Sequence, residues 1–464
     1  MSSPPPGPAL LGYHEATALV AAHAAELRRV PPPVEIVELA QAVGRILACP
    51  LAADRDQPPF ARSTRDGFAC RAAEASTHKP LAVAGATRAG LAPAGPLLPG
   101  TAWEIMTGAP IPSGADAVVM LEHVQAADGR VRLLPPRTVE PGENIVARGA
   151  QARAADEMLP AGTAIHSAQI ALAASCGHAT LPVYARPRVA ILTTGDELVP
   201  VASSPAGGQI RNSNGPMLAA MVAAAGGDPW VLPTAADTPQ ALDAALAQAL
   251  EADLLLITGG VSAGKFDLVE PALARIGARF HFTGLRIQPG KPLVFGELPT
   301  SGATSVQNEN GTKCIQPGKP LVFGELPTSG ATSVQNENGT KCNENGTKCF
   351  FGLPGNPVSS AVTFLLFAAP ILAALAGSRE PAPRFALAQM APSPVDRGGK
   401  PGLTRFLPAF CTFSSLDGQL PQVAFVPWQG SGDLTALARS NCFLVVPEDA
   451  HSLPPGSIVR ILLP

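Results

Sequence analysis

The chain has 464 residues, of which 46% are apolar and 15% are charged, and its formal net charge is −3. A chain of this length exceeds what one hydrophobic core organises, so we expect two to four domains, and the apolar content excludes an intrinsically disordered polypeptide. The sequence contains no Lys/Arg-rich run, so its charge pattern indicates no nucleic-acid partner.

The N-terminus and the cysteines indicate the cellular compartment of the protein. The first residues, Met1-Ser-Ser-Pro-Pro-Pro, lack the basic and apolar segments of a secretory signal. The most apolar stretch, residues 362–376, contains Pro370 and is too short for a bilayer, which predicts a buried helix and no membrane association. None of the eight cysteines shows Cys-x-x-Cys spacing. We therefore expect a cytoplasmic protein without a zinc site or a disulfide framework.

The first third of the chain predicts a helical segment followed by a β-rich module. Residues 13–27 have the pattern of a helix, and residues 37–47 that of a strand and a short helix. Between residues 52 and 148 glycine and proline are frequent and the apolar runs are short, which favours a small β module. Asp66 lies in a proline-rich bend of this module and Thr107 follows a predicted strand. Both segments look like binding loops, and an ordinary structural turn explains each equally well.

Strands and helices alternate from residue 186 onward. Such alternation predicts a parallel sheet with right-handed crossovers, whose ligands bind beyond the carboxyl ends of the strands. A long apolar helix begins at Pro357, and after residue 381 short strands and turns predict a C-terminal β-barrel or sandwich. The predicted strands of the alternating region are residues 189–193, 230–232, 254–257 and 280–287, and its earlier helices begin near Asn214, Thr238 and Asp267.

One glycine-rich turn stands out as a candidate anion site. It contains Gly259, Gly260 and Ser262 and connects a buried strand to a helix that starts near Asp267. Glycines let backbone N–H groups approach a ligand closely, and a helix N-terminus favours phosphate or another oxyanion. An ordinary βα turn, with Asp267 as a helix cap, is the alternative.

Three other turns are expected at the same sheet edge. Glu197 follows the first strand, Lys291 lies between two prolines after the strand that ends at residue 287, and Leu353-Pro354-Gly355-Asn356-Pro357 precedes the long helix. Backbone donors, an ammonium group and carboxylates together suit a nucleotide or phosphate ester with Mg²⁺. Taken singly, Glu197 is also explained as a surface turn residue, Asp237 as part of a helix cap, and Pro357 as the first residue of a helix.

A perfect internal duplication interrupts the chain. Residues 287–314 recur unchanged as 315–342, and residues 343–349 repeat the last seven once more. The repeats of solenoid proteins differ in sequence and recur along the whole fold, whereas this one is perfect and local. A recent tandem duplication or a sequence-assembly error therefore explains this tract better. The copy supplies a second lysine, Lys319, in the same Pro-Gly-Lys-Pro context as Lys291. Because a parallel sheet has room for one copy, we expect Lys291 in the site and the surplus 35 residues, 315–349, to be exposed and protease-sensitive.

These motifs, in this order, resemble the molybdopterin molybdenumtransferase family, which includes the gephyrin E domain. The resemblance extends from about Gly12 to the C-terminus. It is carried by Asp66-Gly-Phe-Ala69, Ile105-Met-Thr-Gly-Ala-Pro-Ile-Pro112, Gly142-Glu-Asn-Ile145, Thr194-Gly-Asp-Glu-Leu198, Gly208-Gln-Ile-Arg-Asn212, Gly259-Gly-Val-Ser262, Pro289-Gly-Lys-Pro292 and Gly352-Leu-Pro-Gly-Asn-Pro357.

The resemblance implies a multidomain α/β plus β fold. A central parallel-sheet α/β molybdopterin-binding domain would be flanked by a β-rich insert domain and a C-terminal β-barrel-like domain. The corresponding ranges are 10–51 with 150–185 for a discontinuous domain I, 52–149 for domain II, 186–380 for domain III and 381–464 for domain IV. A homodimer of elongated subunits is also implied, with the insert domain of one subunit forming one wall of the site and the α/β domain of the other subunit forming the second wall.

The activity implied by the resemblance is the Mg²⁺-dependent insertion of molybdate into adenylyl-molybdopterin, which releases AMP and molybdenum cofactor. Asp267 and Glu197 are then expected to hold Mg²⁺, and Lys291 to neutralise charge at phosphorus. Arg405 is a candidate partner for molybdate or the pterin phosphate, and Asp66, Thr107 and Asp237 complete the expected site. The residues expected to contact nucleotide or pterin are Gly259, Gly260, Ser262, Pro354, Asn356, Pro357 and Arg405.

Two departures and two alternative functions accompany this prediction. Ala61 replaces an aspartate that is usual in the family, and Gln288 replaces a frequent lysine, which leaves one cation fewer near the phosphate. The related molybdopterin adenylyltransferase is usually the α/β domain alone, so the flanking regions argue against it. A gephyrin-like scaffold lacks support from a partner domain or long linker. Transient contact with other molybdenum-cofactor biosynthesis enzymes is expected, and the sequence does not distinguish molybdate from tungstate.

Overall fold

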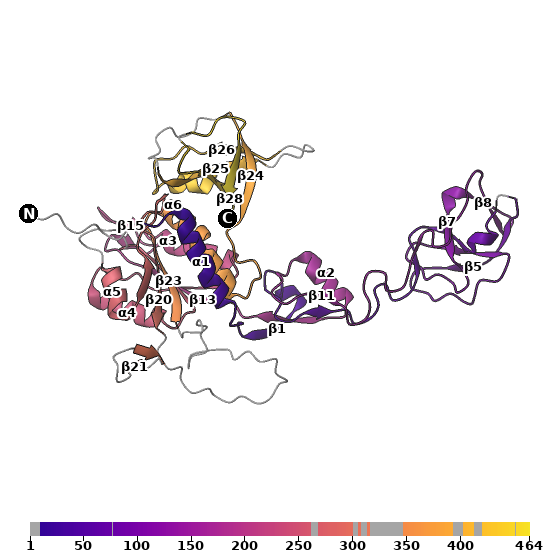
Figure 1. The fold of residues 1–464 in the computed structure, drawn as a ribbon, viewed down its shortest axis with the longest axis horizontal. Coiled ribbons are helices and arrows are strands. Elements are labelled where there is room, and N and C mark those ends of the chain that lie inside the picture. The colour runs from indigo at the N-terminus through magenta and orange to yellow at the C-terminus, as the bar shows by residue number, and fades with distance from the viewer. Residues whose placement is uncertain are drawn as a thin grey trace, which may run out of the picture.

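The computed structural model describes residues 10–76, 78–260, 268–299, 305–307, 313–315, 347–392, 402–412, 420–450 and 452–464. The molecule is elongated (Figure 1). An α/β domain and a neighbouring barrel lie at one end, a thin extension carries β1, β11 and α2, and a β-rich module lies at the far end. This arrangement separates the loops of the β-rich module widely from the α/β domain of the same chain.

The α/β domain is built on a six-stranded mixed sheet. Four of its strands are parallel, as predicted, but the last two alternate in direction, so the sheet is not parallel throughout. The antiparallel pairs are β20 with β23, where Val294 faces Gly352, and β18 with β20, where Arg279 faces Glu297. In spatial order the strands are β16 (Asp228–Val231), β13 (Arg188–Thr193), β17 (Leu254–Thr258), β23 (Thr347–Leu353), β20 (Val294–Pro299) and β18 (Arg279–Phe282).

Helices cover both faces of this sheet. Alternate strand residues point to opposite faces, and two separate hydrophobic clusters result. One face is covered by α1 (Tyr13–Leu27), α3 (Asn214–Ala224), α6 (Pro357–Thr363) and α7 (Ala369–Leu375), and the other by α4 (Pro239–Ala249) and α5 (Val269–Arg275).

Helix α1 has the predicted limits, and its place in the fold is informative. Its buried side chains, among them Val20 and Leu27, belong to the same cluster as Phe295 and Phe351 of the sheet. The N-terminal helix therefore completes the core of the α/β domain. The four domain ranges stay a prediction, and the one drawn from 10 to 51 includes this helix.

The long apolar helix is a core element. Residues Pro357–Leu375 form a 19-residue helical run with a mean hydropathy of 2.2, long enough to cross a bilayer, and 83% of it is buried inside the protein. The expectation that the run is too short was therefore wrong, while the expectation of a buried helix is confirmed. A π-helical turn at Phe364–Ala368 separates α6 from α7, with Pro370 in the first turn of α7.

The duplicated tract enters the sheet at two places. The first copy supplies β20, and the final partial copy supplies the beginning of β23, Thr347, Lys348 and Cys349. The prediction that residues 315–349 are the surplus copy is therefore corrected, because residues 347–349 belong to β23. The surplus segment is 312–346, which has the same 35-residue length (346 − 311 = 35). Within the tract, β21 (Ser305–Gln307) and β22 (Lys313–Ile315) form an antiparallel pair, whereas Lys319 lies outside the described residues.

Two chain segments build the extension between the two ends of the molecule. They share a small core that includes Leu47, Leu51, Ile165 and Val183. Its elements are β1 (Val34–Glu38) paired with β12 (Thr180–Tyr184), β2 (Leu51–Ala52) paired with β11 (Glu157–Leu159), a 3-10 turn at Leu39–Gln41, and α2 (Ser167–Ser175).

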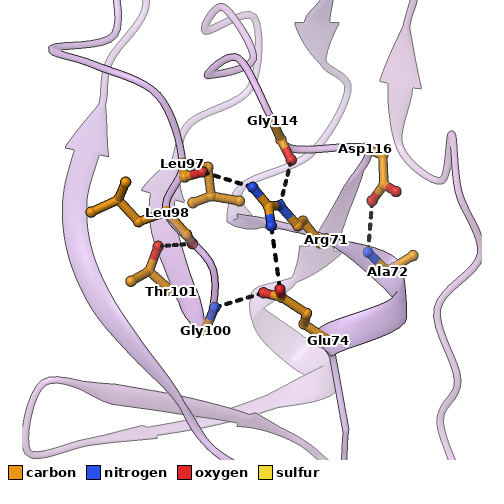
Figure 2. A network of polar contacts seen from close by, with 9 residues as sticks. All are labelled: Arg71, Ala72, Glu74, Leu97, Leu98, Gly100, Thr101, Gly114 and Asp116. Carbon is orange, nitrogen blue, oxygen red and sulfur yellow. Dashed lines mark hydrogen bonds and ion pairs between the residues drawn. The ribbon is translucent and has the colours of Figure 1, made fainter.

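The β-rich module is a six-stranded sheet, reached through the pair β3 (Arg62–Ser63) and β10 (Ile145–Val146). Figure 2 shows how its irregular loops are held: Arg71 Nε donates to Gly114 O at 3.2 Å, and Glu74 Oε2 accepts from Gly100 N at 2.8 Å. This network lies where β4 ends and β6 begins. The strands in order are β7 (Ala117–Met120), β4 (Gly67–Cys70), β6 (Thr101–Ile105), β5 (Leu81–Thr87), β9 (Arg130–Leu133) and β8 (Val124–Ala127).

The C-terminal region closes into a five-stranded barrel, because β25 pairs with both β26 and β27. The strand expected over 280–287 is wrong: β18 ends at Phe282, and the separate strand β19 (Ile287–Gln288) pairs with β25 of the barrel. The barrel strands are β25 (Thr404–Thr412), β26 (Gln422–Phe425), β24 (Phe385–Met390), β28 (Ile458–Leu462) and β27 (Cys442–Val446), with α8 (Leu434–Arg439) beside them.

Candidate functional site

Three central strands of the α/β sheet end side by side. Thr193 of β13 is in register with Thr258 of β17, and Thr258 with Leu353 of β23. The turns after these strands therefore share the carboxyl edge of the sheet, as predicted. The antiparallel strand β20 begins at this same edge, since Val294 pairs with Gly352, and this places the Lys291 loop there as well.

Thr258 ties two of these turns together. Its hydroxyl donates to Pro354 O at 3.3 Å and accepts from Asn214 Nδ2 at 3.0 Å. Asn214 Nδ2 also donates to Gly355 O at 2.5 Å, and Ser360 Oγ donates to Pro354 O. The backbone of the Pro354–Gly355 turn is thus held rigidly next to the glycine loop.

The glycine loop requires glycine for steric reasons. Gly259 and Gly260 have φ values of 97° and 59°. A Cβ on Gly259 would collide with Thr194 O, and a Cβ on Gly355 would lie 3.7 Å from Gly259 Cα. Two backbones therefore approach each other without side chains between them, the kind of glycine-rich turn at which backbone N–H groups can approach an anion. Ser262 and Asp267 lie outside the described residues, and α5 begins only at Val269.

Carboxylates line one flank of the glycine loop. Asp237 accepts a hydrogen bond from Thr194 Oγ1 and its backbone N donates to Asp196 Oδ1 at 3.0 Å. The helix cap of α4 is Thr238, whose hydroxyl accepts from Ala241 N, so Asp237 is not needed as a cap. The Glu197 carboxylate folds back over Gly195, where a Cβ would lie 2.7 Å from Glu197 Oε2.

Two cations belong to neighbouring segments, Lys291 to the loop before β20 and Arg405 to the barrel strand β25. Lys291 is exposed in its loop, and its carbonyl accepts from Leu285 N at 2.8 Å. Arg405 of β25 is in register with Gln288, three residues before Lys291. Its side chain is 2% exposed, and its Nη1 has no hydrogen-bond partner among the described residues. A buried guanidinium N–H without an acceptor is costly, so this position favours an anionic partner.

The barrel also contacts the long-helix turn. Asn356 Nδ2 donates to Ser431 Oγ at 2.9 Å, and Val358 N donates to Ser431 O at 3.0 Å. Pro357 is buried at the first position of α6, where its missing N–H costs nothing. The barrel loop that carries Ser431 is therefore hydrogen-bonded to the turn that begins α6.

Asp66 and Thr107 meet each other in the β-rich module, which lies far from the α/β domain of the same chain (Figure 1). Asp66 Oδ1 accepts from Thr107 N at 2.6 Å and from Thr107 Oγ1 at 2.9 Å. The backbone N–H and then the hydroxyl of Thr107 lower the pKa of Asp66, which keeps it ionised. Both residues are exposed on neighbouring strand ends, β4 and β6.

Sequence reasoning missed Asn214, Thr258 and Ser360 as site residues. Asn214 begins α3, and an Asn at a helix start is normally explained as a cap. In the structure its Nδ2 bridges two strand ends, and its Oδ1 is buried without a partner among the described residues. The sequence does not reveal this bridge, because it depends on the pairing of β17 with β23, which brings Thr258 next to the Pro354–Gly355 turn.

Comparisons with known proteins agree with this architecture. Family models match residues 11–177 as the MoeA N-terminal region (domain I and II), 190–374 as a probable molybdopterin binding domain, and 391–463 as the MoeA C-terminal region (domain IV). A molybdopterin molybdenumtransferase of Nostoc sp. is 35% identical over 349 residues, 74% of this chain and 70% of the relative. The chain belongs to the molybdopterin molybdenumtransferase family.

Other molybdopterin molybdenumtransferases extend the match over nearly the whole chain. The Bacillus subtilis protein is 32% identical over 437 residues, 92% of this chain and 89% of its own. A crystal structure of the molybdopterin biosynthesis moeA protein from Pyrococcus horikoshii OT3 superposes with a TM-score of 0.71 and 26% identity, covering 98% of this chain and 100% of the other. The predicted family, fold class and transferase activity are thereby confirmed.

Proposed function

We propose that this molybdopterin molybdenumtransferase inserts molybdate into adenylyl-molybdopterin with release of AMP, requires Mg²⁺, and acts as a cytoplasmic homodimer. The observation that supports this most directly is the arrangement at the sheet edge. The backbones of Gly259 and Gly355 approach each other at this edge, Glu197 follows the neighbouring strand β13, and Lys291 precedes β20, which begins at the same edge. A phosphoanhydride needs such a combination of backbone donors and cations.

The chain's own residues have distinct tasks in this proposal. The N–H groups of the glycine loop bind the adenylyl phosphate, and the Pro354–Gly355 turn, held by Asn214 and Thr258, orients it. Lys291 faces the same edge and stabilises the negative charge that develops on the departing phosphate oxygens. Arg405 presents a buried N–H to molybdate or the pterin phosphate.

The carboxylates fit a magnesium site that is completed by substrate. Mg²⁺ in nucleotide sites commonly takes one or two carboxylates and fills its remaining positions with water and phosphate oxygens. Glu197 is available at the turn after β13, and Asp267 follows the glycine loop in the sequence. When bound, the ion would neutralise phosphate charge.

The second wall of the site is proposed to come from the partner subunit. Asp66 and Thr107 form a preorganised, exposed pair, yet their β-rich module lies at the opposite end of the elongated molecule from the α/β domain (Figure 1). A two-fold dimer in which the β-rich module of one subunit reaches the α/β edge of the other resolves this separation.

The test is molybdate-dependent AMP release. Purified protein is incubated with adenylyl-molybdopterin, Mg²⁺ and molybdate, and AMP is quantified. Lys291→Ala should lower the rate by about 100-fold, in the range for loss of one charge-stabilising group. Lys79→Ala, an exposed lysine of the β-rich module, is the matched control and should leave the rate unchanged.

Three outcomes would redirect the proposal. If folded, dimeric protein releases no AMP, the proposed molybdenumtransferase reaction is contradicted. ATP-dependent adenylylation of molybdopterin would instead support the adenylyltransferase activity. If the protein shows neither activity but binds other molybdenum-cofactor biosynthesis enzymes, the result would support a scaffold function. Replacing molybdate by tungstate in the same assay measures the metal preference directly.

A further inference from the structure

Two histidines and a glutamate converge on the side of the α/β domain away from the candidate site. His23 comes from α1, His281 from β18 and Glu297 from β20. Glu297 is in register with Cys349, and Cys349 with Leu254, the first residue of β17. The cluster therefore lies toward the amino-terminal edge of the parallel strands, whereas the glycine loop follows their carboxyl ends.

The separations within the cluster match a metal-ligand set. His23 Nε2 and His281 Nε2 are 3.1 Å apart, His281 Nε2 is 3.3 Å from Glu297 Oε2, and His23 Nε2 is 3.9 Å from Glu297 Oε1. Metal–ligand bonds of about 2.0–2.1 Å in a tetrahedron place neighbouring ligand atoms about 3.3 Å apart. Among the described residues this is the one group of three His, Cys, Asp or Glu ligands so close together.

The tautomer of His23 suits a ligand. Its Nδ1 lies 2.9 Å from Leu19 O, and a carbonyl can only accept, so Nδ1 carries the proton. The lone pair of the neutral ring is then on Nε2, the atom that faces the cluster. A metal-binding histidine typically donates its other N–H to a carbonyl or carboxylate in this way.

The cluster lies in a largely dry site. The side chains of His23, His281 and Glu297 are 16%, 7% and 8% exposed. Two imidazoles and a carboxylate suit Zn²⁺ or Co²⁺ better than Mg²⁺ or Ca²⁺, which prefer oxygen ligands.

We propose that His23, His281 and Glu297 bind one borderline divalent transition-metal ion of the Zn²⁺ type. The ion would join the N-terminal helix α1 to β18 and β20, the last two strands of the sheet. Its role is structural, because the cluster is remote from the glycine loop. Cysteine spacing, on which the expectation of no zinc site was based, carries no information about His23 and His281, which are more than 250 positions apart.

The test uses full-length protein stripped of metal with a chelator and titrated with Co²⁺ in the presence of millimolar Mg²⁺, which occupies oxygen-ligand sites. One equivalent of Co²⁺ should bind, with visible absorption bands of a low-coordinate nitrogen and oxygen site, and Zn²⁺ should displace it. Loss of one ligand in His23→Gln or His281→Gln should weaken binding by about 100-fold or more. His14→Gln, an exposed histidine of the same helix, is the matched control and should bind like the parent.

A measurement on the unmutated chain keeps the test independent of variant folding. Hyperfine-shifted proton signals from two histidine rings should appear in the Co²⁺ form. A hydrogen-bonded His–His–Glu group without metal predicts no stoichiometric binding and no shifted signals, and that result would overturn the proposal. So would thiolate-to-cobalt charge-transfer bands, or equal weakening in His14→Gln and His23→Gln. Histidine variants are preferred over Glu297 variants because the duplicated copy carries an equivalent glutamate, Glu325.

Discussion

At the scale of single residues, backbone contacts decide which polar groups are ready for chemistry. Asp66 is held by two hydrogen bonds from one neighbour, Thr107, and both bonds favour its ionised form. An acid whose pKa is lowered in the folded state stays charged as the pH falls through its ordinary range. The pair is therefore preorganised as an anion at physiological pH, which suits contact with a metal ion, a cation or a hydroxyl group of substrate.

The first prediction concerns this pair. Asp66→Asn should reduce molybdate-dependent AMP release by about 100-fold, because the charge is lost while the size of the side chain is kept. Thr107→Val should cause a smaller loss, since the backbone N–H of residue 107 remains, and Thr107→Ser should retain most activity. Steady-state rates at saturating Mg²⁺ measure all three. Equal rates for Asp66→Asn and the parent chain would show that the carboxylate does not take part.

At the scale of elements, the duplicated tract shows how identical sequence acquires different structure. The run Leu293–Leu298 forms most of β20, whereas its copy at 321–326 lies outside the described residues. The triplet Thr-Lys-Cys begins β23 only in its last copy, at Thr347, where Phe350 and Phe351 follow it directly. The two aromatic residues are completely buried, so the copy joined to them is the one drawn into the sheet.

The second prediction follows from those two strands. Deleting residues 312–346 joins Gly311 to Thr347 and leaves β20, β23 and their register unchanged. A shorter connection between β20 and β23 loses less conformational entropy when its ends are brought together. The free energy of unfolding should therefore rise slightly, by about 1 kcal/mol. Urea unfolding and AMP release of the shortened chain measure the effect. A large loss of stability would mean that the tract makes contacts the fold requires.

At the scale of the whole molecule, the elongated shape is the observation behind the proposal that two subunits share the site. The α/β domain, which carries Lys291 and Gly259, forms one end of the molecule, and the β-rich module, which carries the Asp66–Thr107 pair, forms the other (Figure 1). The extension between them is held by paired strands from two distant segments, β1 with β12 and β2 with β11. Because this connection is structured, the module cannot simply fold back onto its own α/β domain.

The third prediction is complementation between inactive subunits. When Asp66→Asn and Lys291→Ala chains are mixed and allowed to exchange, about half of the dimers are mixed. Each mixed dimer has one site with both native residues and one with neither, so about a quarter of the parent activity should return. Sites formed within single chains would instead show no recovery. Each variant alone and a mixture kept from exchanging are the controls.

Local signals account for the elements that the sequence predicted well. Helix α1 has the predicted limits, and α4 starts with the predicted Thr238–Pro239 cap, because periodicity and caps act within a few residues. The end of β18 at Phe282 was missed because Ile287 and Gln288 pair with Thr404 and Arg405, more than 100 residues away. Apolar residues alone do not reveal which sheet receives them.

The sequence by itself determined the family, the fold class and the turns that carry Glu197, Gly259, Lys291 and Asn356, since these depend on motifs and short-range patterns. Only the tertiary structure placed α1 in the α/β core, joined Asn214 to Thr258 and Gly355, and gathered His23, His281 and Glu297. Those contacts depend on strand register and helix packing between distant segments. Register is set by burial of whole faces of a sheet, and no local pattern contains that information.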